Sequence, residues 1–279
     1  MPLHDLVHYF NQESARQYGQ HAPQPALQQV SDDQVVAHYA DLTLESVFQP
    51  VFGDEPGRPA GFEALLRARR NLHGDAPREA GQPLPPASIF LLPTNAQEVI
   101  YLDRLCRTLH ALNFLLQDPA PSQWLSVNIH PRHLTGVLKE HGLVFETILQ
   151  QLGLSPANVV LEIPATAVSQ VTHLEEAVLN YRARGYRITL DGVTPTALAT
   201  PALAGLRPHI IKLDLRQETP VPALPPVQDS VLAALGVREE QQAALRANGV
   251  RLFQGFDLGR PQRTLHQPPS QEHRHAFSA

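Results

Sequence analysis

Six polar residues stand alone in otherwise apolar runs of the sequence, and their chemical types could bind a metal ion and a phosphate ester. They are Glu63, Asn128, Glu162, Asp191, Lys212 and Gln254. Three carboxylates and an amide oxygen are ligands that suit a hard cation such as Mg²⁺ or Mn²⁺. Lys212 adds a point charge for phosphate, and Arg67 adds a planar fork of donors for it. This combination predicts a site for a phosphate ester.

Each of these residues also has an ordinary structural explanation. Asn128 and the pair Asp191-Gly192 could form turns. Lys212 could extend its ammonium group from a strand end to solvent, and Gln254-Gly255 could form a bulge. We favour a shared site because buried carboxylates cost several kcal/mol unless they are paired or bind a metal. Six polar residues on six different predicted strands are explained more simply by one shared site than by six unrelated structural roles.

The segments that carry these residues alternate with helical patterns, which is typical of repeated βα units. Strands are predicted at residues 46–51, 61–69, 124–130, 159–164, 187–193, 209–215, 230–237 and 251–259. Thr94-x-x-Gln97 opens a helix with an apolar stripe at Leu102, Leu105, Leu109, Leu112 and Leu116. Thr172-x-x-Glu175 opens another helix, and Gly185 is placed to end it. Together they predict an α/β fold, a (β/α)₈ TIM-like barrel whose site gathers at the C-terminal ends of the strands.

Three regions are predicted along the chain. Residues 1–43 form an N-terminal helical extension, because Ser31-x-x-Gln34 has the form of a capping box before Val35, Val36 and Tyr39. Residues 44–261 form the barrel, and residues 262–279 form a disordered tail. Within the barrel, residues 71–86 are interpreted as an exposed loop. The four prolines of residues 216–229 leave little room for a helix.

The composition favours a globular protein of the cytoplasm. Apolar residues make up 43% and charged residues 18% of the 279 residues. The net charge of -5 gives no basic field for a DNA or RNA polymer. Cys106 is the only cysteine, which excludes an internal disulfide and suits a reducing compartment. No run approaches the roughly 18 apolar residues of a membrane span, so none is expected.

Several short segments, in the order of the predicted strands, resemble the signatures of the EAL family. They are Phe48-Gln49-Pro50, Gly61-Phe62-Glu63-Ala64-Leu65-Leu66-Arg67, Ser126-Val127-Asn128, Leu161-Glu162-Ile163, Leu190-Asp191, Ile211-Lys212-Leu213-Asp214, and Gln254-Gly255 with Arg260-Pro261. The resemblance covers residues 44–261. It implies a barrel whose members hydrolyse cyclic di-GMP to the linear dinucleotide with two metal ions, or bind it without cleaving it.

The resemblance also implies roles for individual residues. The first metal site would consist of Glu63, Asn128, Glu162 and Asp191. Glu63 and Lys212 would be the catalytic residues, with Lys212 near the attacking water. The nucleotide would contact Gln49, Leu65, Arg67, Asp191 and Gln254.

The chain departs from the family pattern at several acidic positions. Gly192 stands where the family has a second aspartate, and Ala165 replaces the second acid of a Glu-x-x-Glu signature. On the seventh strand, Leu235 and Arg238 replace two further acids. Two-metal hydrolysis needs an ion on each side of the reacting phosphate, and each lost electrostatic group typically costs on the order of 10² to 10³ in rate. Binding of the nucleotide does not depend on these acids.

The sequence therefore predicts a degenerate EAL protein that binds cyclic di-GMP as a non-catalytic receptor or signalling module. It would hold Mg²⁺ or Mn²⁺ in the first site only, weakly or not at all, and would pass its state to a protein partner. One alternative is an active or weak phosphodiesterase in which Glu239 or Glu240 substitutes for a lost acid. Another is a protein-interaction scaffold that no longer binds nucleotide. The oligomeric state is left open, a homodimer included.

Overall fold

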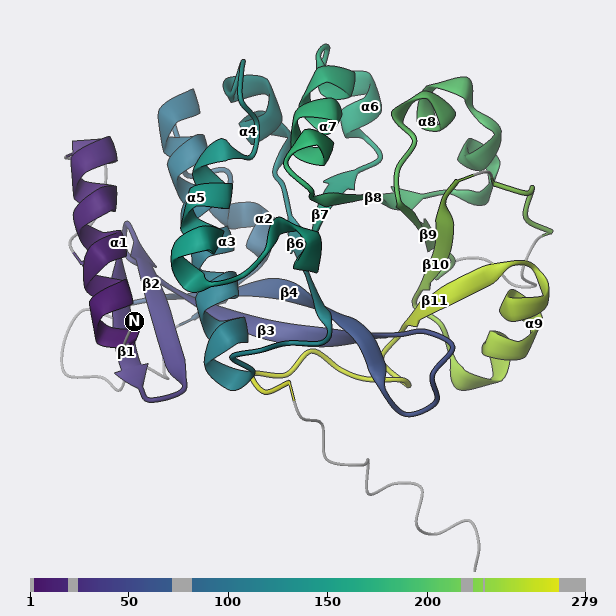
Figure 1. Ribbon diagram of the computed structural model, residues 1–279, viewed down its shortest axis with the longest axis horizontal. Coiled ribbons are helices and arrows are strands. Elements are labelled where there is room, and N and C mark those ends of the chain that lie inside the picture. Colours follow the sequence, from purple (N-terminus) through teal and green to yellow (C-terminus); the bar gives the residue numbers. More distant parts are fainter. Residues whose placement is uncertain (1–2, 20–24, 72–81, 217–222, 228, 266–279) are drawn as a thin grey trace, which may run out of the picture.

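The protein is represented by a computed structural model that describes residues 3–19, 25–71, 82–216, 223–227 and 229–265. Each predicted strand of the barrel is present (Figure 1). The strands are β3 (Leu42–Phe52), β4 (Pro59–Arg70), β6 (Trp124–Asn128), β7 (Val159–Pro164), β8 (Arg187–Val193), β9 (Ile210–Asp214), β10 (Val231–Leu235) and β11 (Val250–Gln254). They are ordered β3-β11-β10-β9-β8-β7-β6-β4, and β4 pairs with β3 to close the ring. The predicted eight-stranded barrel is confirmed.

The strand β3 runs antiparallel to both of its neighbours, β4 and β11, whereas the other barrel pairs are parallel. Only residues 53–58 join β3 to β4. A parallel crossover needs about 10–12 residues, so this connection has to be a hairpin. The first connection of the barrel is therefore a hairpin in place of a βα unit, and the barrel is mixed.

Helices cover the outside of the barrel in the connections that were predicted to hold them. The strand β5 (Pro83–Leu84) and the helices α2 (Pro86–Ile89) and α3 (Ala96–Gln117) lie between β4 and β6. The later connections contain α4 (Pro131–Gly136), α5 (Leu143–Leu152), η3 (Pro156–Asn158), α6 (Ala167–Gln170), α7 (Leu174–Ala183), η4 (Pro195–Ala199), α8 (Pro201–Leu206), η5 (Glu239–Gln241) and α9 (Gln242–Ala247). Asn95 caps α3 by accepting a hydrogen bond from the Glu98 amide at 3.0 Å, one residue later than predicted.

The described residues of the Pro-rich connection between β9 and β10 contain no helix. Leu224 and Val227 instead pack against the main core. Residues 217–222 and 228 of this connection lie outside the described residues, as do residues 72–81 of the predicted exposed loop.

The N-terminal region contains the helix α1 (Leu3–Tyr18), but the helix predicted after Ser31 is wrong. There the chain forms a hairpin of β1 (Leu27–Ser31) and β2 (Gln34–Tyr39), and Ser31 pairs with Gln34 across the turn. The two residues 32–33 form the short turn that is typical of a hairpin. Val35, Val36 and Tyr39 are β-branched or aromatic residues, which favour strands. Because β2 pairs with β3, this hairpin extends the sheet of the barrel.

The long helix α3 joins the hairpin to the barrel because it is buried on two sides. Its residue Phe114 lies in the barrel core, whereas Leu102 and Leu109 of the predicted stripe lie in a second core under α1 and the hairpin. Between the two cores, the Asn113 side chain donates to the Val35 carbonyl and accepts from the Val35 amide, both at 2.9 Å. The Asn113 side chain thus forms the two hydrogen bonds that the Val35 amide and carbonyl would otherwise form with a neighbouring strand.

The first residues of the predicted disordered tail pack on the barrel. Gln262 exchanges backbone hydrogen bonds with Phe48, at 2.6 and 3.0 Å, and Leu265 is buried. These residues are ordered because they continue the pairing of β3 and cover apolar surface. Residues 266–279 lie outside the described part.

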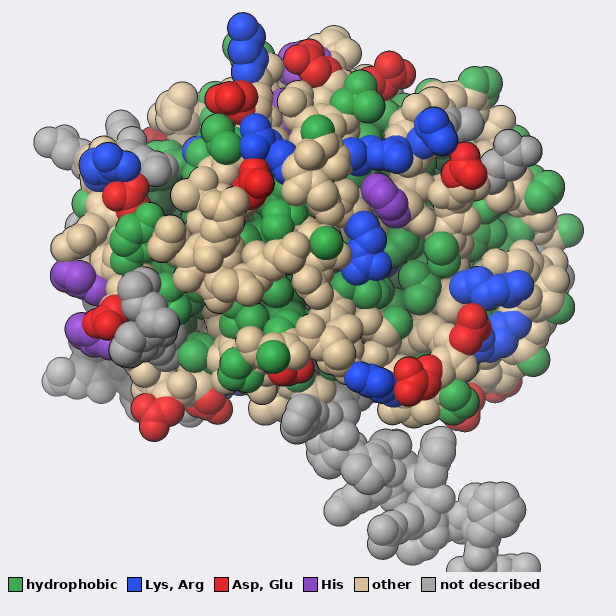
Figure 2. Space-filling model, in the orientation of Figure 1, with side chains coloured by type: hydrophobic (Ala, Val, Ile, Leu, Met, Phe, Trp, Pro, Cys, Tyr) green, Lys and Arg blue, Asp and Glu red, His purple; other side chains and the backbone are tan. Residues whose placement is uncertain are grey.

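The surface has charges of both signs. On the face drawn in Figure 2, basic and acidic side chains are interspersed. Among the described residues, no helix is long and apolar enough to cross a membrane.

We predict that Asn113→Ala lowers the free energy of unfolding by about 2–4 kcal/mol, because it leaves two buried backbone groups of Val35 without partners. Urea unfolding followed by circular dichroism measures the change. Asn180→Ala is the control, since Asn180 bonds only the Glu176 carbonyl on the surface of α7. Equal stability losses in the two variants would contradict the proposed role of Asn113.

Candidate functional site

The ammonium group of Lys212 is the centre of the polar cluster inside the barrel. Its Nζ donates to Glu63 Oε2 at 2.8 Å and to the two carboxylate oxygens of Glu162 at 2.8 and 3.0 Å. The three side chains come from β9, β4 and β7, and each residue is at most 8% exposed. Because removing a charge from water costs several kcal/mol, these charges can be buried only as a group.

Neutral side chains complete the hydrogen bonding of the two glutamates. Gln254 on β11 donates to Glu63 Oε2 at 2.8 Å, and Asn128 at the end of β6 donates to Glu63 Oε1 at 3.2 Å. The Ser126 hydroxyl donates to Glu162 Oε1. Of the six residues predicted from the sequence, the structure therefore connects five directly, and Asp191 lies beside them.

The imbalance of three carboxylates against one ammonium shifts the pKa values of the cluster. Burial and the charge of Glu63 raise the pKa of Glu162 to about 8, although Lys212 opposes the rise. Burial also acts to raise the pKa of Glu63, but the Lys212 charge and three hydrogen bonds outweigh it and hold that pKa below its usual range. The nearby carboxylates raise the pKa of Lys212 against the effect of its burial. The arrangement therefore favours an ionised Glu63 beside Lys212 and makes Glu162 easier to protonate than a free glutamate.

Asp191 at the end of β8 does not join the hydrogen-bonded cluster. Burial raises its pKa, although the Lys212 charge lowers it. Its Oδ1 is buried and has no hydrogen-bond partner among the described residues. The next residue, Gly192, has a φ of +71°, and a Cβ atom there would meet nothing within 4 Å. The position therefore has room for a side chain but a backbone that suits glycine.

A second acceptor without a partner belongs to the β11 residue of the cluster. Gln254 Oε1 is buried and has no partner in the described part of the chain. The following Gly255 is required by close packing, since a Cβ there would lie 2.0 Å from the Val237 carbonyl oxygen. The structure shows no register shift at this residue, so the bulge considered for Gln254-Gly255 is not observed.

Gln49, Leu65 and Arg67 lie near the cluster without bonding to it. Gln49 is directly opposite Glu63 on β3 and donates to the Gly259 carbonyl at 3.1 Å. Leu65 and Arg67 follow Glu63 at two-residue steps on β4, which places them on the same face, toward the C-terminal end. The Arg67 side chain is exposed and donates to the Leu66 carbonyl, and no described carboxylate pairs with it.

The end of β10 contributes no acid to the cluster. Leu235 is in register with Asp214 and Gln254 on the neighbouring strands, so it does lie at the level of the site. Arg238 is beyond the strand, is half exposed and pairs with Glu240 at 3.3 Å. Asp214 is held by Arg216 in a two-pronged ion pair, at 2.5 and 2.8 Å.

The four residues proposed as a metal site have suitable chemistry but are not arranged around a common point. Glu63, Asn128, Glu162 and Asp191 lie on adjacent strands and offer oxygen ligands, and the orphaned Asp191 Oδ1 could accept a cation. The two glutamates, however, are already drawn to Lys212. No three His, Cys, Asp or Glu side chains of the described residues form a group that could hold a metal ion. As arranged, the site fits an ammonium ion better than a divalent metal.

Ser126 belongs to the motif Ser126-Val127-Asn128, but the sequence predicted no role for it in the site. It lies two residues before Asn128 on β6 and therefore points to the same side of the strand. That spacing is the signal that could have identified it. Among the described side chains, its buried hydroxyl is the neutral group that donates a hydrogen bond to Glu162.

Comparison with known proteins adds a family and a set of related folds. The sequence model described as EAL domain matches residues 36–219. Klebsiella pneumoniae BlrP1, solved as a complex with calcium and cyclic di-GMP, is 20% identical with a TM-score of 0.59. That comparison covers 78% of this chain and 56% of BlrP1. A comparison with curated protein sequences found no match.

Two further solved structures give similar values. Bacillus subtilis YkuI, a protein with an EAL domain solved with the substrate cyclic di-GMP and calcium, is 20% identical with a TM-score of 0.60, over 80% of this chain and 57% of YkuI. The PaMucR phosphodiesterase in its cyclic di-GMP complex is 20% identical with a TM-score of 0.58, over 78% of this chain and 92% of PaMucR. The chain spans less than two thirds of BlrP1 and YkuI, and at these identities the similarity shows the fold alone.

We predict that Lys212→Met lowers the free energy of unfolding by about 3–5 kcal/mol, because Glu63 and Glu162 lose their buried cation. Mn²⁺ should restore part of this loss, since the ion would take over the vacated position, and it should stabilise the parent protein less. Urea unfolding with and without Mn²⁺ measures both effects.

Lys139→Met is the matched control for this experiment. Lys139 is the other lysine of the chain and is exposed on the surface. Its replacement should change stability by less than about 0.5 kcal/mol. Equal responses to Mn²⁺ in Lys212→Met and in the parent protein would contradict competition between the ammonium group and the ion.

Proposed function

The chain belongs to the EAL domain family, and we propose that it binds cyclic di-GMP at the mouth of the barrel without hydrolysing it. It would act as a receptor or signalling module that passes ligand occupancy to a protein partner. The observation that carries this proposal is that Gly192 and Leu235, which lie at the level of the Lys212 cluster, offer no side-chain oxygen for a second metal ion. In the cluster itself, Lys212 already pairs with Glu63 and Glu162.

Loss of hydrolysis is supported by the surroundings of Lys212. Structural relatives were solved with calcium or manganese beside cyclic di-GMP. Here Gly192 and Leu235 offer no side-chain oxygen, and Asp214 is occupied by Arg216. At most one ion, Mg²⁺ or Mn²⁺, would bind in the first site, and it would compete with Lys212. Two-metal chemistry requires a second ion about 3.5–4 Å away.

Retention of binding is supported by groups that keep hydrogen-bonding capacity for a ligand in the described part of the protein. The exposed Arg67 guanidinium can donate two hydrogen bonds to a phosphate. The buried acceptors Asp191 Oδ1 and Gln254 Oε1 could accept from the N–H or O–H groups of a nucleotide. Each net hydrogen bond from a ligand to these acceptors would contribute about 1 kcal/mol to binding.

The alternative of an active or weak phosphodiesterase rests on the first-site acids lying on adjacent strands. It would require a replacement acid, and Glu240 is exposed and paired with Arg238 instead. The alternative of a scaffold without nucleotide binding would leave the two orphaned acceptors unexplained. Calorimetric titration with cyclic di-GMP separates the scaffold from the other two functions.

In that titration, we expect the parent protein to bind cyclic di-GMP and Arg67→Ala to weaken binding by about 1.5–3 kcal/mol, because a charge-assisted hydrogen bond to phosphate is lost. Arg70→Ala is the control, since Arg70 lies on the other face of β4 and pairs with Asp41. Absence of binding by the parent, or equal affinity in Arg67→Ala, would overturn this part of the proposal.

Incubation of the purified protein with cyclic di-GMP and excess Mn²⁺ should give no linear dinucleotide beyond a metal-only control. Chromatography of the products measures this outcome. Turnover near one per second, which is within the ordinary range of enzymes, would establish the phosphodiesterase alternative.

We expect Gly192→Asp to remain inactive, because one added carboxylate does not displace Lys212 or supply the remaining ligands of a second ion. It should also lower the free energy of unfolding by about 1 kcal/mol or more, since the backbone at φ +71° disfavours a side chain and Asp191 is adjacent. Even a combined change with Leu235→Glu and Arg238→Glu should recover only a trace.

Gly153→Asp is the matched control for the backbone effect. Gly153 has a φ of +78° with nothing near its missing Cβ, at the end of α5 and away from the cluster. A larger loss of stability at Gly192 than at Gly153 would measure the repulsion from the site's carboxylates. Robust Mg²⁺-dependent cleavage by Gly192→Asp alone would show that one aspartate was the only missing part.

A further inference from the structure

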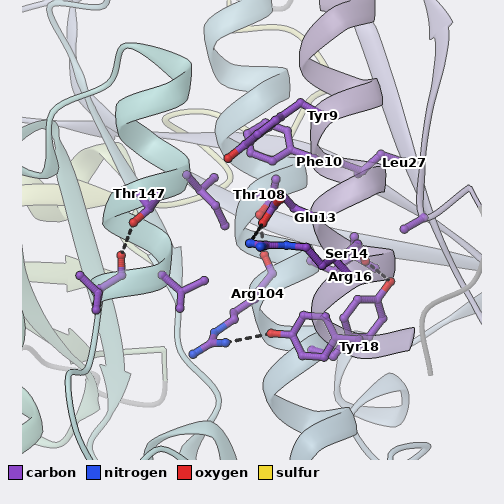
Figure 3. A pocket seen from close by; sticks show the side chains of 16 residues that line it. Tyr9, Phe10, Glu13, Ser14, Arg16, Tyr18, Leu27, Arg104, Thr108 and Thr147 are labelled. Atoms are coloured by element: carbon purple, nitrogen blue, oxygen red, sulfur yellow. Dashed lines mark hydrogen bonds and ion pairs between the residues drawn. The ribbon is translucent and has the colours of Figure 1, made fainter. Parts of the chain in front are cut away.

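A hollow of about 360 Å³ lies on the flank of the barrel, between α1, α3 and α5 (Figure 3). Helix α3 contributes Arg104 and Thr108, and α1 contributes Tyr9 and Phe10 on one side. Helix α5 closes the other side, with Val144 among its contributions. None of the residues of the candidate functional site lines this groove, so it is a separate feature of the molecule.

The walls of the groove are mostly apolar and aromatic. Phe10 packs edge to face with Tyr9 at 5.3 Å, and the rings of Tyr18 and Tyr101 lie 4.7 Å apart. On the opposite wall, Leu143 is 37% exposed although it is a large apolar side chain. Ligand sites are commonly apolar hollows of roughly 300–1,000 Å³ with a few polar groups, so this groove has the size of a small site of that kind.

Arg104 gives the groove its charge. Its Nη1 donates to the Tyr18 hydroxyl at 2.8 Å, as Figure 3 shows, and no described carboxylate pairs with it. The other charged side chains of the lining, Arg16 and Glu13, pair with each other at 2.8 Å. The lining therefore has one uncompensated positive charge.

The neutral polar groups of the groove can also bind a negatively charged ligand, because they can donate hydrogen bonds to it. Burial raises the pKa of Tyr101 to about 12, so its hydroxyl stays neutral and can donate. A guanidinium group presents parallel donors that match a carboxylate, and Tyr18 already holds the side chain of Arg104 in place.

We propose that this groove binds a small amphipathic carboxylate. Its apolar body would lie against Tyr9, Phe10 and Val144, and its carboxylate would pair with Arg104. The proposal does not depend on the binding of cyclic di-GMP, because the two sites share no residue. It assigns the N-terminal helix a function, since α1 forms one wall of the site.

The test is calorimetric titration of the full chain with octanoate, and with 1-octanol as a neutral ligand of the same length. We expect octanoate to bind and 1-octanol to bind at least about tenfold more weakly, which corresponds to the loss of one charge-assisted hydrogen bond. Equal affinity for the two, or no binding of octanoate, would overturn the proposal without relying on any variant.

Variants then locate the site. Arg104→Met should weaken octanoate binding about tenfold or more, and Val144→Trp should abolish it by filling the groove from a half-buried position of α5. Arg58→Met is the control, since Arg58 lies on the β3–β4 hairpin and not in the groove. Circular dichroism and thermal unfolding verify that each variant folds. Unchanged octanoate binding in folded Arg104→Met or Val144→Trp would place the ligand elsewhere and overturn the assignment.

Discussion

The ion pairs of Lys212 with Glu63 and Glu162 constrain the interior of this barrel more than any other interaction. They join β9, β4 and β7, which are distributed around the ring, at a place where water is largely excluded. Buried charges are stable only when their geometry is maintained, so the three strands have to keep their relative positions. The same requirement limits the chemistry of the site, because an ammonium ion and a divalent metal ion cannot both take the position between two carboxylates.

Closure of the ring is what brings these side chains together. The strand β3 closes the barrel as an antiparallel member, with β4 on one side and β11 on the other. Its pairing with β4 puts Gln49 opposite Glu63, and its neighbour β11 brings Gln254 to the same carboxylate. At Gly61 the barrel has room only for hydrogen, since a Cβ would lie 2.1 Å from the Trp124 ring. The β3–β4 hairpin stands in place of the first βα unit, and it still positions Gln49 and Glu63 at the common site.

Much of this arrangement could be predicted from the sequence, because buried parallel strands are short apolar runs whose polar exceptions are conspicuous. The partners of Lys212 could not be predicted in this way, since they depend on which strands meet after closure. The hairpin at Ser31 was missed for a different reason. A capping-box pattern is a local signal, whereas the strand β2 is fixed by Asn113, a residue far along the chain. That Arg104 has no carboxylate partner among the described residues likewise becomes visible only when α1, α3 and α5 are packed together.

Helix α3 lines the groove with Arg104 and Thr108 and also bonds to the chain beside the candidate functional site. Asp103, adjacent to Arg104, accepts from the His130 amide at 2.9 Å, and His130 follows the site residue Asn128 by two positions. Contiguity of this kind is not coupling, which requires an element with two arrangements that both ligands bias. Asp103 also forms a buried ion pair with Arg107, at 2.6 Å and with both side chains at most 2% exposed. Breaking such a pair costs about 3–5 kcal/mol, so α3 serves as a fixed support. A ligand in the groove would therefore act on the position of α1 against α3, and the strand β6 would stay where the closed barrel holds it.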